Sequence, residues 1–168
     1  MTSPAPSPMT VTTATEREIL AAWLDFHRGV VVAKTAQLSP EDAGRRHVPS
    51  QTTLAGLLRH LAVTEREWFQ QTVAGAAPAP GERTDDPDTS WDVEQDEDLA
   101  RLVQAYEDEC ARSRAVVAGH ELDDVVVHPQ LGEVSVRWVL VHMIEETARH
   151  AGHADILREL TDGSIGVV

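Results

Sequence analysis

Apolar residues recur every three or four positions in four long segments of the chain, which is the spacing of helices with one face toward a core. The pattern predicts helices over about residues 15–37, 53–74, 96–118 and 135–160. Thr15 followed by Glu18 forms a capping-box pattern at the first start, and Gly119 marks the third end. The expected core face of the first helix holds Ile19, Trp23, Phe26 and Val30. The sequence therefore predicts an all-α fold, a four-helix bundle.

The segments between these helices carry turn and loop signals. Two valine-containing runs, 125–129 and 133–136, flank the turn residues 130–132, and they predict either a short hairpin or an extended arm before the last helix. The acidic stretch 82–98 predicts a solvated connection, with Trp91 packed back onto the helices as an anchor. Residues 1–13 are rich in Pro, Ser and Thr, so we expect a flexible lead-in to one domain over residues 14–168.

Charge and composition narrow the function classes. The 168 residues carry a formal net charge of −14, which repels nucleic-acid phosphates and anionic bilayers. A single cysteine, Cys110, cannot form an internal disulfide, and we expect it to be a buried structural residue. No apolar run is long enough to span a membrane, and the N-terminus lacks the pattern of a secretory signal. We therefore expect a cytoplasmic protein that binds neither nucleic acid nor membrane.

Polar residues interrupt one stripe of the last predicted helix. At 100° per residue, one narrow stripe collects His142, Glu146, His150 and His153. The stripe continues through Trp138 and Val139 on one side and through Leu157 and Leu160 on the other, so we expect it to face the core. Burying ionisable groups is costly without a compensating partner, such as a metal ion or a satisfied hydrogen-bond network.

The spacing Glu146-x3-His150 places a carboxylate and an imidazole one helical turn apart, a geometry that can bind one divalent cation. His60, among the leucines of the second helix, is the candidate third ligand. Glu67 lies two turns further along nearly the same face, where it either faces solvent, which we favour, or orients a ligand. Three protein ligands leave open positions for water or substrate, which is typical of a catalytic site. Zinc suits this set best, and nickel, iron and manganese also accept it. A core histidine and a hydrogen-bonded pair are the metal-free alternatives.

Two sequence runs carry a resemblance to a known family. They are LLRHLA at residues 57–62 and WVLVHMIEETARHAGHADILRE at residues 138–159. Over about residues 15–160 the chain resembles the DinB-like superfamily, and more narrowly its actinobacterial group that includes the mini-circle proteins. Many members have histidine at the position of Glu146 and glutamine at that of His153. The glutamate form is similar to the bundle of the mycothiol-dependent maleylpyruvate isomerases.

The resemblance implies an up-down-down-up four-helix bundle, often a homodimer, with a divalent metal held by the residues carried onto His60, Glu146 and His150. His153 and His142 are then partners of the ligands or proton-transfer residues. Relatives use low-molecular-weight thiols, so the implied activity is metal-dependent transfer of a mycothiol-type thiol to a small electrophile. A metal-dependent hydrolase and a non-catalytic metal-binding or small-molecule-binding bundle are the alternatives. The sequence leaves the electrophile and the particular thiol open.

Overall fold

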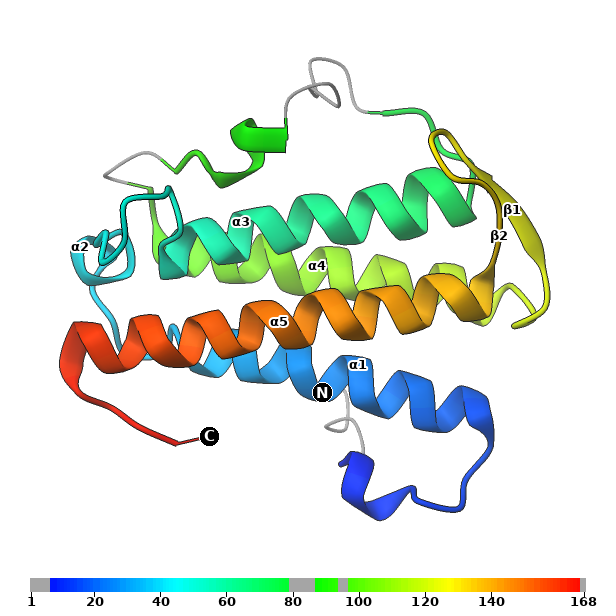
Figure 1. Ribbon diagram of the computed structural model, residues 1–168, viewed down its shortest axis with the longest axis horizontal. Helices are drawn as coiled ribbons and strands as arrows, with labels where there is room; N and C mark the ends of the chain where they lie inside the picture. The colour runs from blue at the N-terminus through cyan, green and yellow to red at the C-terminus, as the bar shows by residue number, and fades with distance from the viewer. Residues whose placement is uncertain (1–6, 79–86, 94–96, 167–168) are drawn as a thin grey trace.

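The chain folds into four long helices that lie side by side in the computed structural model, which describes residues 7–78, 87–93 and 97–166 (Figure 1). The helices are α1 (Glu16–Ala33), α3 (Leu54–Glu65), α4 (Leu99–Ala118) and α5 (Val136–Asp162). Helices α3 and α4 run in one direction, and α1 and α5 run in the opposite direction. The prediction of a helical protein is confirmed. None of the described helices is both long and apolar enough to cross a lipid bilayer.

Shorter elements connect or extend these helices. They are the 3-10 helices η1 (Pro8–Thr10) and η3 (Pro87–Trp91), the one-turn helix α2 (Pro40–Ala43) and the π-helix η2 (Arg66–Val73). Residues 1–6 of the expected lead-in, and residues 82–86 and 94–96 of the expected acidic connection, lie outside the described residues. The segment predicted as the second helix forms two elements, since α3 passes directly into the π-helical η2.

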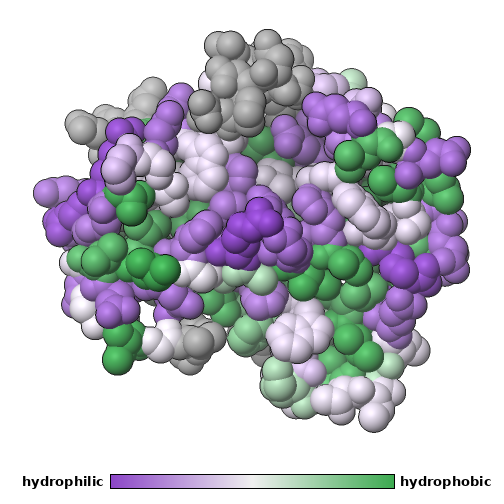
Figure 2. Space-filling view, viewed as in Figure 1, coloured by the Kyte–Doolittle hydropathy of each residue, from purple (hydrophilic) through white to green (hydrophobic). Residues whose placement is uncertain are grey.

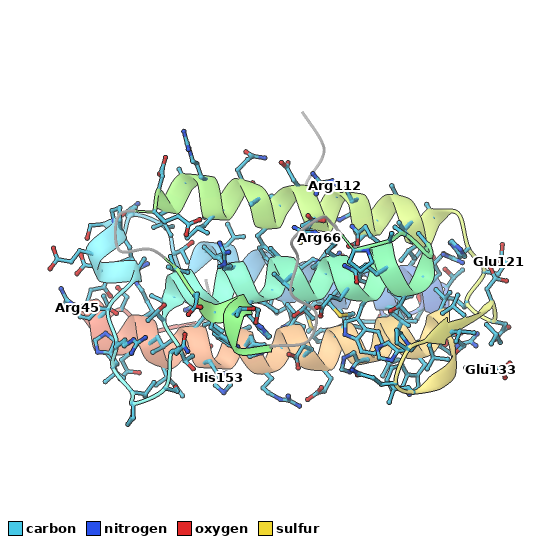
Figure 3. All side chains as sticks on the ribbon, turned by 90° about the horizontal axis from the view of Figure 1, so that it is seen from above. Arg45, Arg66, Arg112, Glu121, Glu133 and His153 are labelled. Carbon is cyan, nitrogen blue, oxygen red and sulfur yellow. The ribbon has the colours of Figure 1, made fainter. Side chains whose placement is uncertain are left out.

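An antiparallel hairpin precedes α5, which decides between the two expected forms of this connection. It pairs β1 (Val125–His128) with β2 (Gly132–Ser135), and Val125 lies opposite Ser135. Gly132 has a φ of 76°, a left-handed conformation that glycine adopts without a steric penalty. Figure 3 shows Glu121 and Glu133 at the hairpin end of the molecule, and Arg45 at the opposite end.

Side-chain caps fix the ends of the helices. The Thr15 side chain and the Glu18 carboxylate form the expected capping box at the start of α1. Thr53 caps α3 by accepting a hydrogen bond from the Gly56 backbone N–H, and Ser135 caps α5 by accepting one from the Trp138 N–H. Gly119 follows α4, as expected. The caps therefore set where the helices that carry the candidate ligands begin.

The apolar core forms two clusters along the helices. One contains Leu57, Leu58 and Leu61 of α3 with Tyr106 and Cys110 of α4. The other gathers Leu24, Phe69, Val73, Val136, Val139, Leu140 and Met143. The expected core face of α1 is partly wrong, because Ile19, Trp23 and Phe26 are only half-buried whereas Leu24 and Val31 are buried. The buried face of α1 is therefore rotated from the expected one toward Leu24 and Val31.

The expected core-facing stripe of α5 is also only partly buried. Its buried residues are Val136, Val139, Leu140, Met143, Thr147, His150, Ala151, Ala154 and Leu157. Trp138 and Leu160, which we expected to face the core, are 43% and 54% exposed. The polar stripe therefore follows the edge of the interface between α5 and α3, where a side chain can be shielded and still reach solvent.

A buried ion pair separates the two apolar clusters. Arg28 of α1 donates to both carboxylate oxygens of Glu65 of α3, with N–O distances of 2.8 and 2.6 Å, and also to Asp25 at 2.8 Å. The side chains of Arg28 and Glu65 are 6% and 1% exposed. A charge this deeply buried needs its partner, since a lone ion would keep most of its desolvation cost.

Replacing Glu65 with alanine is expected to destabilise the fold by about 3 kcal/mol, because among the described residues Arg28 would keep only Asp25 as a hydrogen-bonded partner. Urea unfolding followed by circular dichroism measures the loss. Glu107→Ala removes an exposed carboxylate of α4 and is the matched control, with an expected change within about 0.5 kcal/mol. Equal stabilities of the Glu65 variant and the wild type would contradict the role given to the ion pair.

Candidate metal centre

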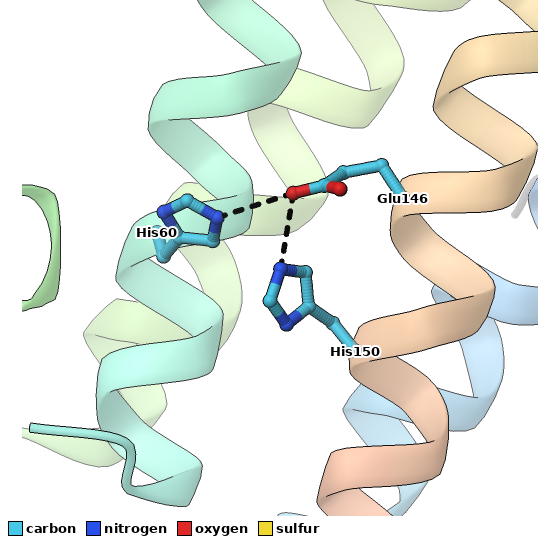
Figure 4. A group of neighbouring side chains, drawn as sticks. All are labelled: His60, Glu146 and His150. Carbon is cyan, nitrogen blue, oxygen red and sulfur yellow. Dashed lines mark hydrogen bonds and ion pairs between the residues drawn. The ribbon is translucent and has the colours of Figure 1, made fainter. Parts of the chain in front are cut away.

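Three candidate ligands from two helices converge at one point. His60 lies on α3, and Glu146 and His150 lie one turn apart on α5 (Figure 4). Oε1 of Glu146 lies 3.0 Å from Nε2 of His150 and 3.5 Å from Nε2 of His60. One ligand atom from each of the three residues lies within 4.8 Å of the others. Donor atoms bound to one zinc ion at about 2.0–2.2 Å stand roughly 3–4 Å apart, so small movements would suffice to hold a cation.

The three side chains are shielded but not sealed off. The side chains of His60, Glu146 and His150 are 18%, 15% and 8% exposed. The indole of Trp91 stacks on the His60 ring, with centroids 4.1 Å apart and planes inclined by 12°. The expectation that Trp91 packs back onto the helices is confirmed, and its partner is a candidate ligand. The partial exposure leaves a path by which a small molecule can approach.

Each imidazole has a second partner outside the group. The Nδ1 of His60 lies 2.9 Å from Oγ of Ser90, and the Nδ1 of His150 lies 3.3 Å from Nδ1 of His153. A hydroxyl and an imidazole can each donate or accept a hydrogen bond, so each ligand ring can carry its proton on either nitrogen. A histidine that binds a cation through Nε2 holds its proton on Nδ1 against such a partner. The surroundings therefore fit a metal ligand set.

The charge of Glu146 also fits this role. The pKa of Glu146 lies well below its usual value because His150 and His60 donate hydrogen bonds to the carboxylate, which outweighs the opposing effect of burial. Its second oxygen, Oε2, accepts from Nη1 of Arg149 at 3.2 Å. The carboxylate is thus ionised at neutral pH, and Arg149 fixes its orientation. Two imidazoles and one carboxylate form a donor set suited to a divalent transition metal.

The other two candidate histidines lie in different places. His153 is exposed on α5 beside His150 (Figure 3). Its pKa is lowered by partial burial and by the neighbouring His150 and Arg149, which favours the neutral ring. His142 is half-buried, and its ring contacts are with Trp68 and Trp138. Of these two histidines, only His153 touches one of the three candidate ligands among the described contacts.

Sequence reasoning missed Ser90, the outer partner of His60. Ser90 lies in η3, thirty positions after His60, within a stretch whose acidic composition indicated only a solvated connection. A serine in such a segment gives no periodic signal. The adjacent Trp91 was the available clue, because a tryptophan in an acidic loop usually has a packing partner.

The cysteine of the chain is unsuited to nucleophilic chemistry. Cys110 is buried in the core cluster beside Tyr106, and it is the only cysteine in the sequence. Burial raises the pKa of its thiol to about 12, mainly by desolvating the thiolate. A thiolate for group transfer would therefore have to come from a bound molecule.

Comparison with known proteins assigns the family. Residues 19–163 match the family described as Mycothiol-S-transferase, and this span includes His60, Glu146 and His150. The chain belongs to the mycothiol S-transferase family. This family is DinB-like, so the resemblance found in the sequence is confirmed. The mycothiol S-transferase match covers α1 from Ile19 onward, all of α3, α4 and α5, and the hairpin.

A solved structure shares the fold of this mycothiol S-transferase family member. It is a conserved protein of Enterococcus faecalis, similar with a TM-score of 0.64 and 17% sequence identity, over 90% of this chain and 100% of the other. At this identity the likeness shows the fold alone. No curated protein matches the sequence.

Wild-type protein purified without chelators is expected to carry about one divalent metal ion per chain, measured by elemental analysis. His60→Ala and His150→Ala each remove one of three protein ligands, so both variants should lose the bound metal. Ser90→Ala keeps all three ligands and is expected to weaken zinc affinity by about tenfold, because the outer partner orients the ligand ring.

The matched control is His27→Ala, which removes a histidine of α1 that stacks on Trp23, away from the three ligands. This variant should retain wild-type metal content. A metal-free wild type, or equal loss in the His27 variant, would overturn the assignment of these three residues.

Cys110 should not react with an aromatic disulfide reagent at pH 8 in the folded protein, because a pKa of about 12 leaves almost no thiolate. Absorbance of the released thiol measures the reaction, and unfolding in urea should release one equivalent. Rapid reaction without urea would show that the Cys110 thiol is accessible and would make it a candidate nucleophile.

Proposed function

We propose that this protein is a metal-dependent enzyme that transfers a low-molecular-weight thiol of the mycothiol type to a small electrophile. The observation that carries the proposal is the convergence of His60, Glu146 and His150 within 4.8 Å, in a chain that matches the Mycothiol-S-transferase family. Three protein ligands leave positions for an exogenous thiol. A divalent cation bound there would lower the pKa of that thiol, so that the thiolate exists at neutral pH.

The residues around the site supply orientation and proton uptake. Glu146 is held by Arg149 on one oxygen and faces both imidazoles with the other. Ser90 and Trp91 fix the plane of the His60 ring, and Trp91 also meets the His150 ring edge-on, with centroids 5.5 Å apart. These contacts keep the ligand set in place before a substrate arrives, which lowers the cost of reorganisation during the reaction.

The proposal assigns proton uptake to His153 and not to His142. His153 is exposed to solvent and contacts His150, so a proton taken up there can pass to water. The His142 ring instead stacks on Trp138, with centroids 5.3 Å apart. Zinc is the proposed metal, because two imidazoles and a carboxylate suit it, with nickel, iron and manganese as the alternatives.

We also propose a bundle topology, a homodimeric assembly and a cytoplasmic location. The directions of α1, α3, α4 and α5 support a DinB-like four-helix bundle of up-down-down-up topology. The exposed apolar side chains of Val141, Ile156 and Leu160 along α5 support a homodimer. A cytoplasmic location is supported by the single buried cysteine, since disulfides are rare in that compartment.

Zinc-loaded protein is expected to accelerate the consumption of mycothiol by allyl chloride, measured with a thiol-reactive dye. Glu146→Gln keeps the side-chain shape but removes the ligand charge, and should lower the rate at least about 100-fold, because a catalytic cation contributes several kcal/mol. His27→Ala should keep the wild-type rate.

The same assay separates the alternatives. Ester hydrolysis without thiol would support a metal-dependent hydrolase and contradict the transferase. Bound metal without turnover of thiol or ester would support a binding protein.

A further inference from the structure

Four aromatic rings form a continuous surface next to the candidate metal centre, which we call the aromatic wall. It consists of Trp68 of η2, His128 of β1, and Trp138 and His142 of α5. Trp68 stacks on His128 with centroids 4.6 Å apart and lies 4.4 Å from His142, and His142 stacks on Trp138 at 5.3 Å. The rings come from three separate segments of the chain, so the fold assembles this surface.

The aromatic wall and the candidate ligands occupy the same edge of the interface between α3 and α5. On α5, Trp138, His142, Glu146 and His150 follow one another at intervals of four residues, so all four share one stripe. One interval of four residues advances about 6 Å along an α-helix. The wall therefore begins about one helical turn from the Glu146 carboxylate.

The π-helix η2 brings Trp68, on the side of the wall opposite α5, closer to the stripe of His60. In a regular α-helix Trp68 would lie about 80° around the axis from His60, eight residues earlier. The i→i+5 hydrogen bonding of η2 (Arg66–Val73) widens the turn, so each residue rotates less and Trp68 stays closer to the stripe of His60. Such π-helical turns occur often at functional sites.

The wall is accessible, and its position is fixed. Trp138 is 43% exposed, while Trp68, His128 and His142 are half-buried. The Nδ1 of His128 accepts from the backbone N–H groups of Gln130 and Leu131, each at 3.2 Å, so the hairpin turn holds this ring. The pKa of His128 is lowered by partial burial and by the nearby His142, which favours the neutral form of the His128 ring. Figure 2 shows apolar side chains gathered at the hairpin end of this face.

We infer that the aromatic wall binds an aromatic ring of the electrophile, and that Trp138 and His142 select aromatic over aliphatic acceptors. The inference rests on the proposed function, because the thiol held at the candidate metal centre sets where the reacting carbon lies. A planar ring attached directly to that carbon would reach the level of His142, one turn along α5. Aromatic rings bind other rings by stacking, which adds to the gain from apolar burial.

The reaction can be written for benzyl chloride as the acceptor. The sulfur–carbon bond forms as the carbon–chlorine bond breaks, and chloride leaves with the bonding electron pair. The thiol proton passes to water, and the product is the S-benzyl conjugate of mycothiol. No oxidant or reductant takes part.

Binding of two product conjugates to the zinc-loaded protein tests the inference without requiring turnover. S-benzyl mycothiol should bind about tenfold more tightly than S-methyl mycothiol, as isothermal titration calorimetry would measure. In Trp138→Leu and in His142→Ala this preference should fall to about threefold or less. Zinc content and circular dichroism verify that each variant is folded and loaded, and the two variants change different parts of the wall.

The matched control is Trp23→Leu, which removes a half-buried tryptophan of α1 that stacks on His27. It should keep the full preference for the benzyl conjugate. Equal binding of the two conjugates by the wild type, no binding of either, or an unchanged preference in both wall variants would overturn the inference. Turnover of mycothiol with allyl chloride reports on the proposed function separately, since that acceptor has no ring to stack.

Discussion

The organisation of the site depends on the contacts of one Glu146 oxygen, which lies between imidazoles of two helices. Polar groups removed from water between packed helices have to satisfy one another, and here a carboxylate and two rings do so across α3 and α5. The segment η3 then shields the outer side of His60, and Arg149 occupies the remaining oxygen of Glu146. The same contacts that offset the cost of burial also leave two ring nitrogens and a carboxylate directed at one point.

A second buried polar contact serves the scaffold. On α1, Arg28 lies between Leu24 of one apolar cluster and Val30 of the other, and on α3 its partner Glu65 lies between Leu61 and Phe69. Apolar packing alone would allow α1 to slide along α3, whereas a bidentate ion pair allows one alignment. We interpret the ion pair as a device that fixes the register of these helices.

The sequence carried enough information for the helices and the ligand candidates, because both depend on local spacing. Four residues separate Glu146 from His150 in any α-helix, and leucines around His60 mark a buried face. The rotation of α1, the π-helical turn before Trp68 and the contact of Ser90 with His60 depend on neighbours distant in sequence. Periodicity also grouped His142 with the ligands, because it shows only which stripe of the helix a residue lies on. It does not show that the Trp68 ring, from another element, packs against His142.

Ser135 ends β2 and also caps α5, so no linker separates the hairpin from the helix that carries Glu146 and His150. An insertion at the tip of the hairpin, near Gln130, would leave the phase of α5 unchanged. One residue inserted between Ser135 and Glu146 would instead turn both side chains by about 100° away from His60. Natural variation in length among related chains should therefore concentrate at the tip and be absent from this junction.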